Sequence, residues 1–214
     1  MTSISEVVLE LGSIELVGDL AVPPNSEAIV LFAHGSGSSR RSSRNLAVAA
    51  SLQEAGLGTL LFDLLSDEET AIDARTAALR FDIPFLADRL LEATRWVESA
   101  EELGDLRIGY FGASTGAAAA LVAAAEEQRV GAVVSRGGRP DLARSALARV
   151  TSPTLLIVGG ADSPVIAMNE EAMKELRCEK RMDIVPGATH LFEEPGALEQ
   201  VSDLARDWFV DKLS

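Results

Sequence analysis

The chain has 214 residues, of which 47% are hydrophobic and 24% are charged, a composition typical of a globular domain. Its 19 basic and 33 acidic residues give a formal net charge of −14, which would repel nucleic acid and anionic membranes. The single cysteine, Cys178, excludes an intrachain disulfide and a cysteine-based metal site. We therefore expect one domain over residues 1–214 whose partner is a small-molecule substrate, with no nucleic acid and no membrane.

Neither the N-terminal segment nor the most apolar segment of the chain has the pattern of a targeting or membrane signal. The N-terminal segment carries Glu6 and Glu10 and lacks the basic start of a signal peptide. The most uniform apolar run, 116–125, is far shorter than the about 20 residues that span a bilayer. These features predict a soluble, cytoplasmic protein.

Short apolar segments alternate with helical patterns after an N-terminal hairpin. The predicted strands are 7–11 and 14–22 around a Gly12-Ser13 turn, then 29–33, 57–62, 106–111, 130–135, 154–158 and 181–185. The predicted helices are 45–55, a helix opened by Asp82 and Pro84, 115–127, 141–150, 167–177 and a last helix that starts at Pro195. This alternation predicts a mostly parallel sheet covered on both faces, with an antiparallel hairpin at its edge.

The motif with most chemical content is Gly112-Ala113-Ser114-Thr115-Gly116, which lies between a predicted strand and a predicted helix. G-x-S-x-G in this context is typical of a nucleophile elbow, where a sharp turn exposes the serine hydroxyl. The helix N-terminus behind the serine favours developing negative charge. A glycine-rich turn with a chance serine is the alternative, but the strand and helix around it favour Ser114 as the nucleophile.

A serine nucleophile needs a base, and the chain has only two histidines. His190 follows the predicted strand 181–185 and precedes the last helix, which suits a base that arrives over the serine. His34 also ends a strand, but it opens the loop 34–39, whose glycines free backbone N–H groups to face an oxyanion. We interpret His34 as a structural residue that holds this loop.

The acid that would orient His190 is expected at the end of another strand. Asp162 follows the strand 154–158 and gives the chain order Ser114, Asp162, His190. Asp141 is the alternative acid. Asp162 also precedes Pro164 at a helix start, so it could cap that helix as well as orient the histidine.

Taken together, these motifs resemble those of the α/β-hydrolases, and the chain is similar to the small, lidless dienelactone hydrolase-like family. The residues that carry the resemblance are His34-Gly35-Ser36-Gly37, the 112–116 motif, Gly159-Gly160-Ala161-Asp162 and 187–192. The resemblance implies that the backbone N–H groups of Ser36 and Thr115 hold the oxyanion. Dienelactone hydrolases have a cysteine at the elbow where this chain has Ser114, so the resemblance implies ester-type hydrolysis without identifying a lactone substrate.

The expected fold is accordingly an α/β-hydrolase fold without a lid, since the segment between 135 and 154 is too short to form one. The charged excursion 63–81 is either a loop on the substrate side or a solvated insertion. The expected function is a serine hydrolase that cleaves a small carboxylic ester, thioester or lactone through an acyl-enzyme. The alternative is a binding or regulatory protein that keeps the fold without turnover.

No cofactor or metal is expected. The G-x-G-x-x-G pattern is broken at Arg40, and the two histidines lack the spacing of a zinc site. A further residue of interest is Arg136, which follows directly after the strand 130–135 and could bind an acidic group on the substrate. It could instead pair with a structural acid such as Asp162 or Asp141.

Overall fold

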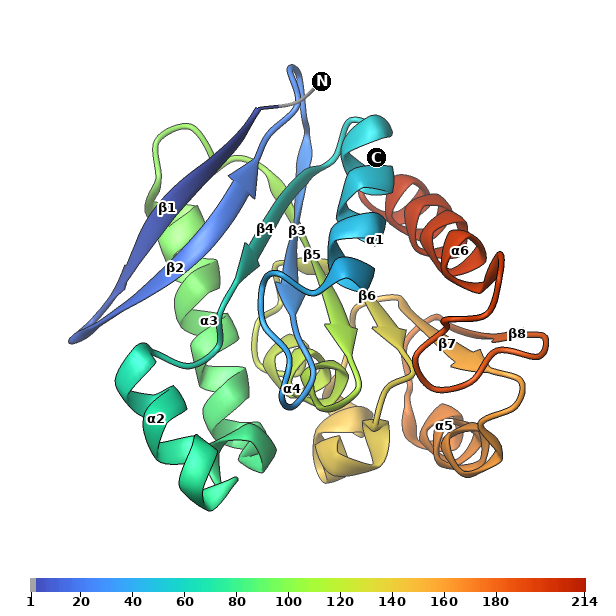
Figure 1. The fold of residues 1–214 in the computed structure, drawn as a ribbon. Helices are drawn as coiled ribbons and strands as arrows, with labels where there is room; N and C mark the ends of the chain where they lie inside the picture. Colours follow the sequence, from blue (N-terminus) through green and yellow to red (C-terminus); the bar gives the residue numbers. More distant parts are fainter. Residues whose placement is uncertain (1–2) are drawn as a thin grey trace.

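The computed structural model describes residues 3–214, which form one eight-stranded sheet with helices on both faces (Figure 1). The strand order is β1-β2-β4-β3-β5-β6-β7-β8. The strands are β1 (Ile4–Leu11), β2 (Ile14–Ala21), β3 (Ala28–Ala33), β4 (Gly58–Phe62), β5 (Arg107–Ala113), β6 (Val130–Arg136), β7 (Thr154–Gly159) and β8 (Lys180–Val185). The hairpin β1–β2 joins β4 in antiparallel fashion, and the pairs from β4 to β8 are parallel. The expected α/β-hydrolase fold with an antiparallel edge is confirmed.

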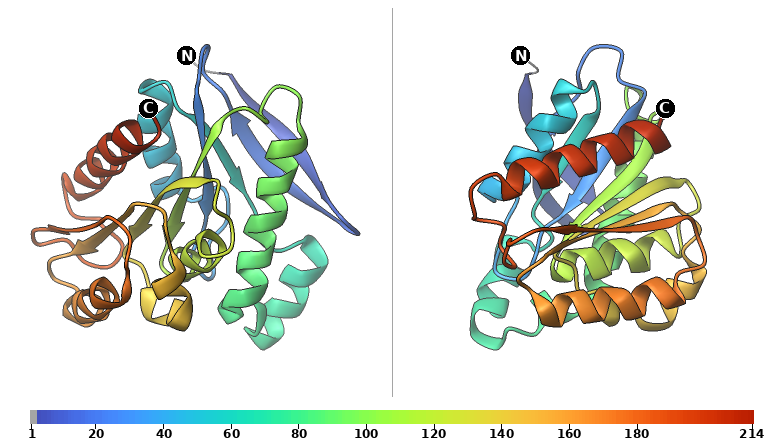
Figure 2. Two further views of the ribbon diagram at one scale, coloured as in Figure 1. Left: turned by 180° about the vertical axis from the view of Figure 1, so that it is seen from behind. Right: turned by 90° about the vertical axis from the view of Figure 1, so that its right-hand side faces the viewer.

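The helices divide between the two faces of the sheet (Figure 2). α1 (Ser43–Glu54) and α6 (Ala197–Lys212) pack together on one face. The other face carries α3 (Ile83–Ser99), α4 (Thr115–Ala124), the 3₁₀ segment η2 (Pro140–Arg149) and α5 (Ser163–Glu175). Between β6 and β7 the chain forms only η2, so no separate lid domain is present there.

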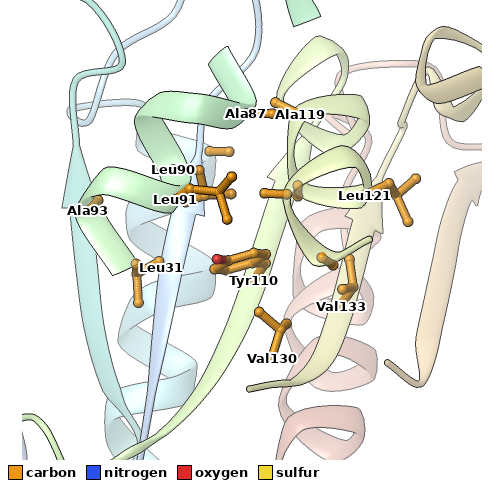
Figure 3. Close-up of a cluster of buried hydrophobic side chains, with 14 of the residues drawn as sticks. Leu31, Ala87, Leu90, Leu91, Ala93, Tyr110, Ala119, Leu121, Val130 and Val133 are labelled. Carbon is orange, nitrogen blue, oxygen red and sulfur yellow. The ribbon is translucent and has the colours of Figure 1, made fainter. Parts of the chain in front are cut away.

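The core consists of two apolar layers, one on each face, because successive residues of a strand point to opposite sides. Leu31, Tyr110 and Val133 point toward α3 and α4, as Figure 3 shows. The phenol of Tyr110 is hydrogen-bonded inside this layer, with its oxygen 2.6 Å from the Thr94 hydroxyl oxygen. The alanines of α4 are fully buried, which lets this helix lie close to the sheet directly behind Ser114.

The structure departs from the predicted elements most clearly at three places. The excursion 63–81 contains α2 (Asp67–Thr76) and the short η1 (Leu79–Phe81), which the polar composition of this segment concealed. α5 begins at Ser163 rather than at residue 167, because Pro164 lies in its first turn. The helix expected at 141–150 is a 3₁₀ helix, interrupted at Arg144, where φ is 49°.

Within residues 3–214, none of the helices combines the length and the apolar character needed to cross a membrane.

Candidate active site

Ser114 lies on a sharp turn between β5 and α4. Its backbone has φ 52° and ψ −118°, a conformation that costs energy for any residue other than glycine. The flanking glycines are required by close packing. A Cβ atom at Gly112 would collide with the backbone of Ala117, and one at Gly116 would collide with the carbonyl oxygen of Ala33. The strained serine is therefore held by the surrounding backbone, as a nucleophile elbow requires.

The end of β6 and the loop that follows it hold the backbone of Ser114 on both sides. Its N–H donates to the carbonyl of Arg136 at 3.2 Å, and its carbonyl accepts the N–H of Arg139 at 3.1 Å. The two glycines between these partners, 137 and 138, thus pass directly beside the elbow. The His190 side chain packs against this loop.

His190 and Asp162 meet at the carboxyl ends of β7 and β8. The His190 Nδ1 atom lies 2.8 Å from Asp162 Oδ2, a hydrogen bond between loops that are 28 residues apart. A Cβ atom at Gly137 would lie 3.6 Å from Cε1 of His190, so the imidazole packs over the loop beside Ser114. Within residues 3–214, no hydrogen bond joins the Ser114 hydroxyl to the imidazole.

The two candidate acids are in different environments. Asp141 pairs with Arg139 through two hydrogen bonds, of 2.9 and 2.8 Å, at the protein surface. Asp162 occupies the N-cap position of α5, but its side chain makes no capping hydrogen bond there. The carboxylate is directed to His190 instead, so the structure brings Asp162 and not Asp141 to the histidine.

The loop after β3 packs against the elbow. A Cβ atom at Gly35 would lie 3.2 Å from Cβ of Ser114, so a side chain at this position would require the elbow to shift slightly. The N–H of Ser36 donates to the hydroxyl oxygen of Thr115 at 2.9 Å. The two residues that the resemblance assigns to the oxyanion hole therefore contact each other directly.

His34 holds this loop in place. Its Nδ1 atom is 3.0 Å from the carbonyl oxygen of Gly35, and its Nε2 atom accepts the N–H of Leu64 at 3.1 Å. Both bonds are satisfied by a neutral ring protonated at Nδ1. Burial lowers the pKa of His34 below its usual value, against the opposing effects of the Gly35 bond and of Asp63. His34 thus has the structural position that we expect for it.

A cavity of about 330 Å³ lies beside this loop, and its far wall is α2 together with Arg80. Arg80 is fixed by Asp73, through Nε to the carboxylate at 2.6 Å and through Nη2 to the backbone carbonyl at 3.2 Å. Its remaining Nη1 atom lies toward Gly37, 3.9 Å from where a Cβ atom would be. Sequence reasoning did not assign Arg80 or Asp73, because the helix that positions them was not predicted.

The cavity lining combines polar groups with a larger apolar area. Besides the residues named above, it includes the serines of the loop and three carboxylates. The lining residues are His34, Gly35, Ser36, Gly37, Ser38, Ser39, Asp63, Leu64, Leu65, Asp67, Thr70, Asp73, Ala74, Arg80, Leu86 and Thr115. Residues of the excursion 63–81 therefore lie beside the site rather than apart from it.

Arg136 is 8% exposed and lies against the ring of Phe111, with 6.0 Å between the guanidinium carbon and the ring centre. Among residues 3–214 no carboxylate pairs with it, so neither Asp162 nor Asp141 is its partner. Burial and, less strongly, the charge of Arg44 lower the pKa of Arg136 to about 10. The side chain remains cationic near neutral pH, with an Nη1 atom that has no partner within the described residues.

The described residues contain no group of three His, Cys, Asp or Glu side chains arranged to hold a metal ion.

Comparison with known proteins identifies the family of the chain. The model of the dienelactone hydrolase family matches residues 17–208. A crystal structure described as a dienelactone hydrolase from Anabaena variabilis is 58% identical, covers 100% of this chain and 99% of its own, and superposes with a TM-score of 0.98. Est1E from Butyrivibrio proteoclasticus shares the fold, with a TM-score of 0.80 at 16% identity over 97% of this chain and 98% of its own.

A curated relative has a different kind of name. A Mycobacterium tuberculosis protein named "Putative phosphoribosyl transferase" is 54% identical over 209 residues, which are 97% of this chain and 46% of that protein. The chain thus spans about half the length of this relative. Because the family model covers most of the chain and the site has the elements described above, the chain belongs to the dienelactone hydrolase family of α/β-hydrolases.

Proposed function

We propose that this member of a hydrolase family is a serine hydrolase that cleaves a small carboxylic ester, thioester or lactone. The observation that carries the proposal is the 2.8 Å bond from Asp162 to His190 beside the strained Ser114. A carboxylate on Nδ1 fixes the imidazole with its basic Nε2 free. That arrangement would allow His190 to take the proton from the serine hydroxyl.

The proposed reaction has two halves. Ser114 Oγ attacks the substrate carbonyl while its proton passes to Nε2 of His190, which gives a tetrahedral oxyanion. The oxyanion is held at the N-terminus of α4, where the N–H of Thr115 is free of helical partners. When the oxyanion collapses, the C–O or C–S bond to the leaving group breaks, and His190 protonates that group. Water then attacks the acyl-serine by the same steps and releases the acid.

The absence of a hydrogen bond between Ser114 and His190 among residues 3–214 is compatible with this scheme. Catalytic hydrogen bonds are often long in unliganded enzymes and tighten when substrate binds. The imidazole packs against Gly137, which has φ 51° and lies between the two residues that bond to the serine backbone.

Labelling with a fluorophosphonate tests the nucleophile. We expect stoichiometric modification of the wild-type protein and none of Ser114→Ala, because an activated serine on an elbow reacts fastest. Asp162→Asn should lower kcat on p-nitrophenyl acetate by about 10³- to 10⁴-fold by stabilising the wrong imidazole tautomer. Asp141→Asn is the matched control and should have little effect, since its partner is Arg139. Labelling that survives Ser114→Ala would contradict the assignment.

The same experiments separate the alternatives. A fold-only binding protein would show neither labelling nor a burst of p-nitrophenol. The transferase name belongs to a relative of which the chain accounts for 46%, so it does not identify the activity of the matched part. Phosphoribosyl transfer without serine labelling would replace our proposal with that activity.

A further inference from the structure

The hydroxyl of Thr115 lies between two parts of the site that are far apart in sequence. Its oxygen accepts the N–H of Ser36 at 2.9 Å, across 79 residues of chain. Thr115 is 2% exposed, and it lines the cavity beside the loop 34–39. It is also the first residue of α4, directly after Ser114. A buried hydroxyl normally has hydrogen-bond partners both for its oxygen, as acceptor, and for its proton, as donor.

The proton of this hydroxyl has no acceptor among residues 3–214. A threonine inside a helix commonly donates to the carbonyl four residues earlier, as Thr94 does to Leu90 at 2.8 Å. Thr115 begins its helix, so the residue four positions earlier, Phe111, belongs to β5 and offers no helical carbonyl. The hydroxyl therefore accepts one hydrogen bond and has a free O–H donor.

The N–H of Ser36, by contrast, is already engaged. The resemblance assigns this group to the oxyanion, but in the structure it points to Thr115 Oγ1. The loop has little room to rearrange, because Gly35 packs against Ser114 and His34 bonds to Gly35 and to Leu64. The Ser36 N–H would have to give up the Thr115 bond to reach a substrate.

We propose that the Thr115 hydroxyl is itself an oxyanion donor, beside the N–H of the same residue. The Ser36 N–H then acts on the hydroxyl: by donating to its oxygen, it orients the O–H and strengthens the bond that the O–H makes to the substrate. No covalent bond changes in this step; the hydroxyl proton stays on Thr115. The inference rests on the proposed serine hydrolase function and changes which groups touch the oxyanion.

Thr115→Val tests this assignment because valine has nearly the same shape and lacks the hydroxyl. We expect kcat on a short ester to fall by about 10²-fold, the typical loss of one oxyanion donor, with KM changed far less. Thr115→Ser keeps the hydroxyl and should retain most of the activity. Thr76→Val removes an exposed hydroxyl on α2 that bonds to Ile72, and it is the matched control.

An unchanged or higher kcat in Thr115→Val would identify the Ser36 N–H as the oxyanion donor. In that arrangement the Thr115 hydroxyl only accepts the Ser36 N–H, so Thr115→Val frees this N–H for the oxyanion and leaves kcat unchanged or raises it. Such a result would overturn the proposal. Where Thr115→Val does not fold, as judged by its melting temperature, the kcat ratio of Thr115→Ser to Thr115→Ala gives the same comparison.

A thionoester separates a catalytic hydroxyl from one that only supports the loop. Sulfur is a weak hydrogen-bond acceptor, so losing a donor should slow the ester far more than its thionoester analogue. Equal losses on both substrates in Thr115→Val would show a structural effect and overturn the proposal. Hydrolysis that survives Ser114→Ala would instead refute the proposed function itself, so the two failures are distinguishable.

Discussion

Two arginines close to the site differ in how their charges are balanced. Arg136 is buried without a carboxylate partner among residues 3–214, whereas Arg80 is held by Asp73 and directs Nη1 toward the cavity. An unbalanced charge in a region of low dielectric acts over a longer distance than a balanced one. We therefore retain the proposal that Arg136 favours an acidic group on the substrate.

Replacing each arginine by glutamine tests charge selection. We expect Arg136→Gln to lower kcat/KM on a carboxylate-bearing ester by about 10-fold more than on its neutral analogue, the value of one charge-assisted interaction. Arg80→Gln is the comparison, and it shows whether the arginine in the cavity contributes instead. If Arg136→Gln costs the same on both esters, Arg136 supports the structure and does not select charge.

At the scale of elements, the site depends on contacts between loops and one helix that was not predicted. α2 begins with a capping box, in which Ser66 and Glu69 bond to each other's backbone N–H groups. Glu69 also pairs with Arg89 of α3, which ties the cavity wall to the sheet-covering helix. The polar segment is thus an ordered wall of the cavity.

The contact of His34 with two loops predicts a dependence of stability on pH. Its pKa is lowered in the folded protein, so the unfolded chain binds a proton more readily. The full stabilisation is therefore present above about pH 6.5, the pKa in the unfolded chain, and is lost progressively as the pH falls toward the folded value. Asp63 opposes this shift without reversing it.

We expect the melting temperature to fall between pH 7.5 and pH 5.5, and to fall less in His34→Gln, which cannot titrate. His34→Gln should also melt lower than the wild type at pH 7.5, since it lacks the fixed ring between Gly35 and Leu64. Calorimetry across this range measures both effects. Parallel curves for the two proteins would show that other groups cause the pH dependence.

At the scale of the whole molecule, only η2 lies between β6 and β7, so no lid domain is present there to cover a long substrate. The cavity beside the loop 34–39 has a volume of about 330 Å³. A long acyl chain would keep most of its methylene groups in water and would not gain the about 0.8 kcal/mol that each buried methylene contributes. Short acyl groups should therefore be the better substrates.

A series of p-nitrophenyl esters from acetate to laurate checks this expectation. We expect kcat/KM to be highest for two to four acyl carbons, about tenfold above laurate, and to show no increase at a lipid interface. Preference for the laurate ester, or activation by micelles, would mean that an apolar surface outside this cavity binds the substrate.

The sequence alone determined the features that depend on residues close together in the chain. Ser114 within a strand–turn–helix motif, the parallel sheet and the family could be inferred from it because apolar periodicity and glycine spacing are local properties. With only two histidines in the chain, the choice of base was also limited. α2 was missed because its apolar pattern is weak and only Asp73 is buried in it.

Tertiary structure decided the features that join distant segments. Asp162 and Asp141 were both possible acids from chain order, and the 2.8 Å approach of His190 distinguishes them only once β7 and β8 lie side by side. The bond from Ser36 to Thr115 likewise exists because β3 pairs with β5 and brings the two loops together. Which donor meets which acceptor depends on differences of an ångström between loops, and sequence patterns carry no such distances.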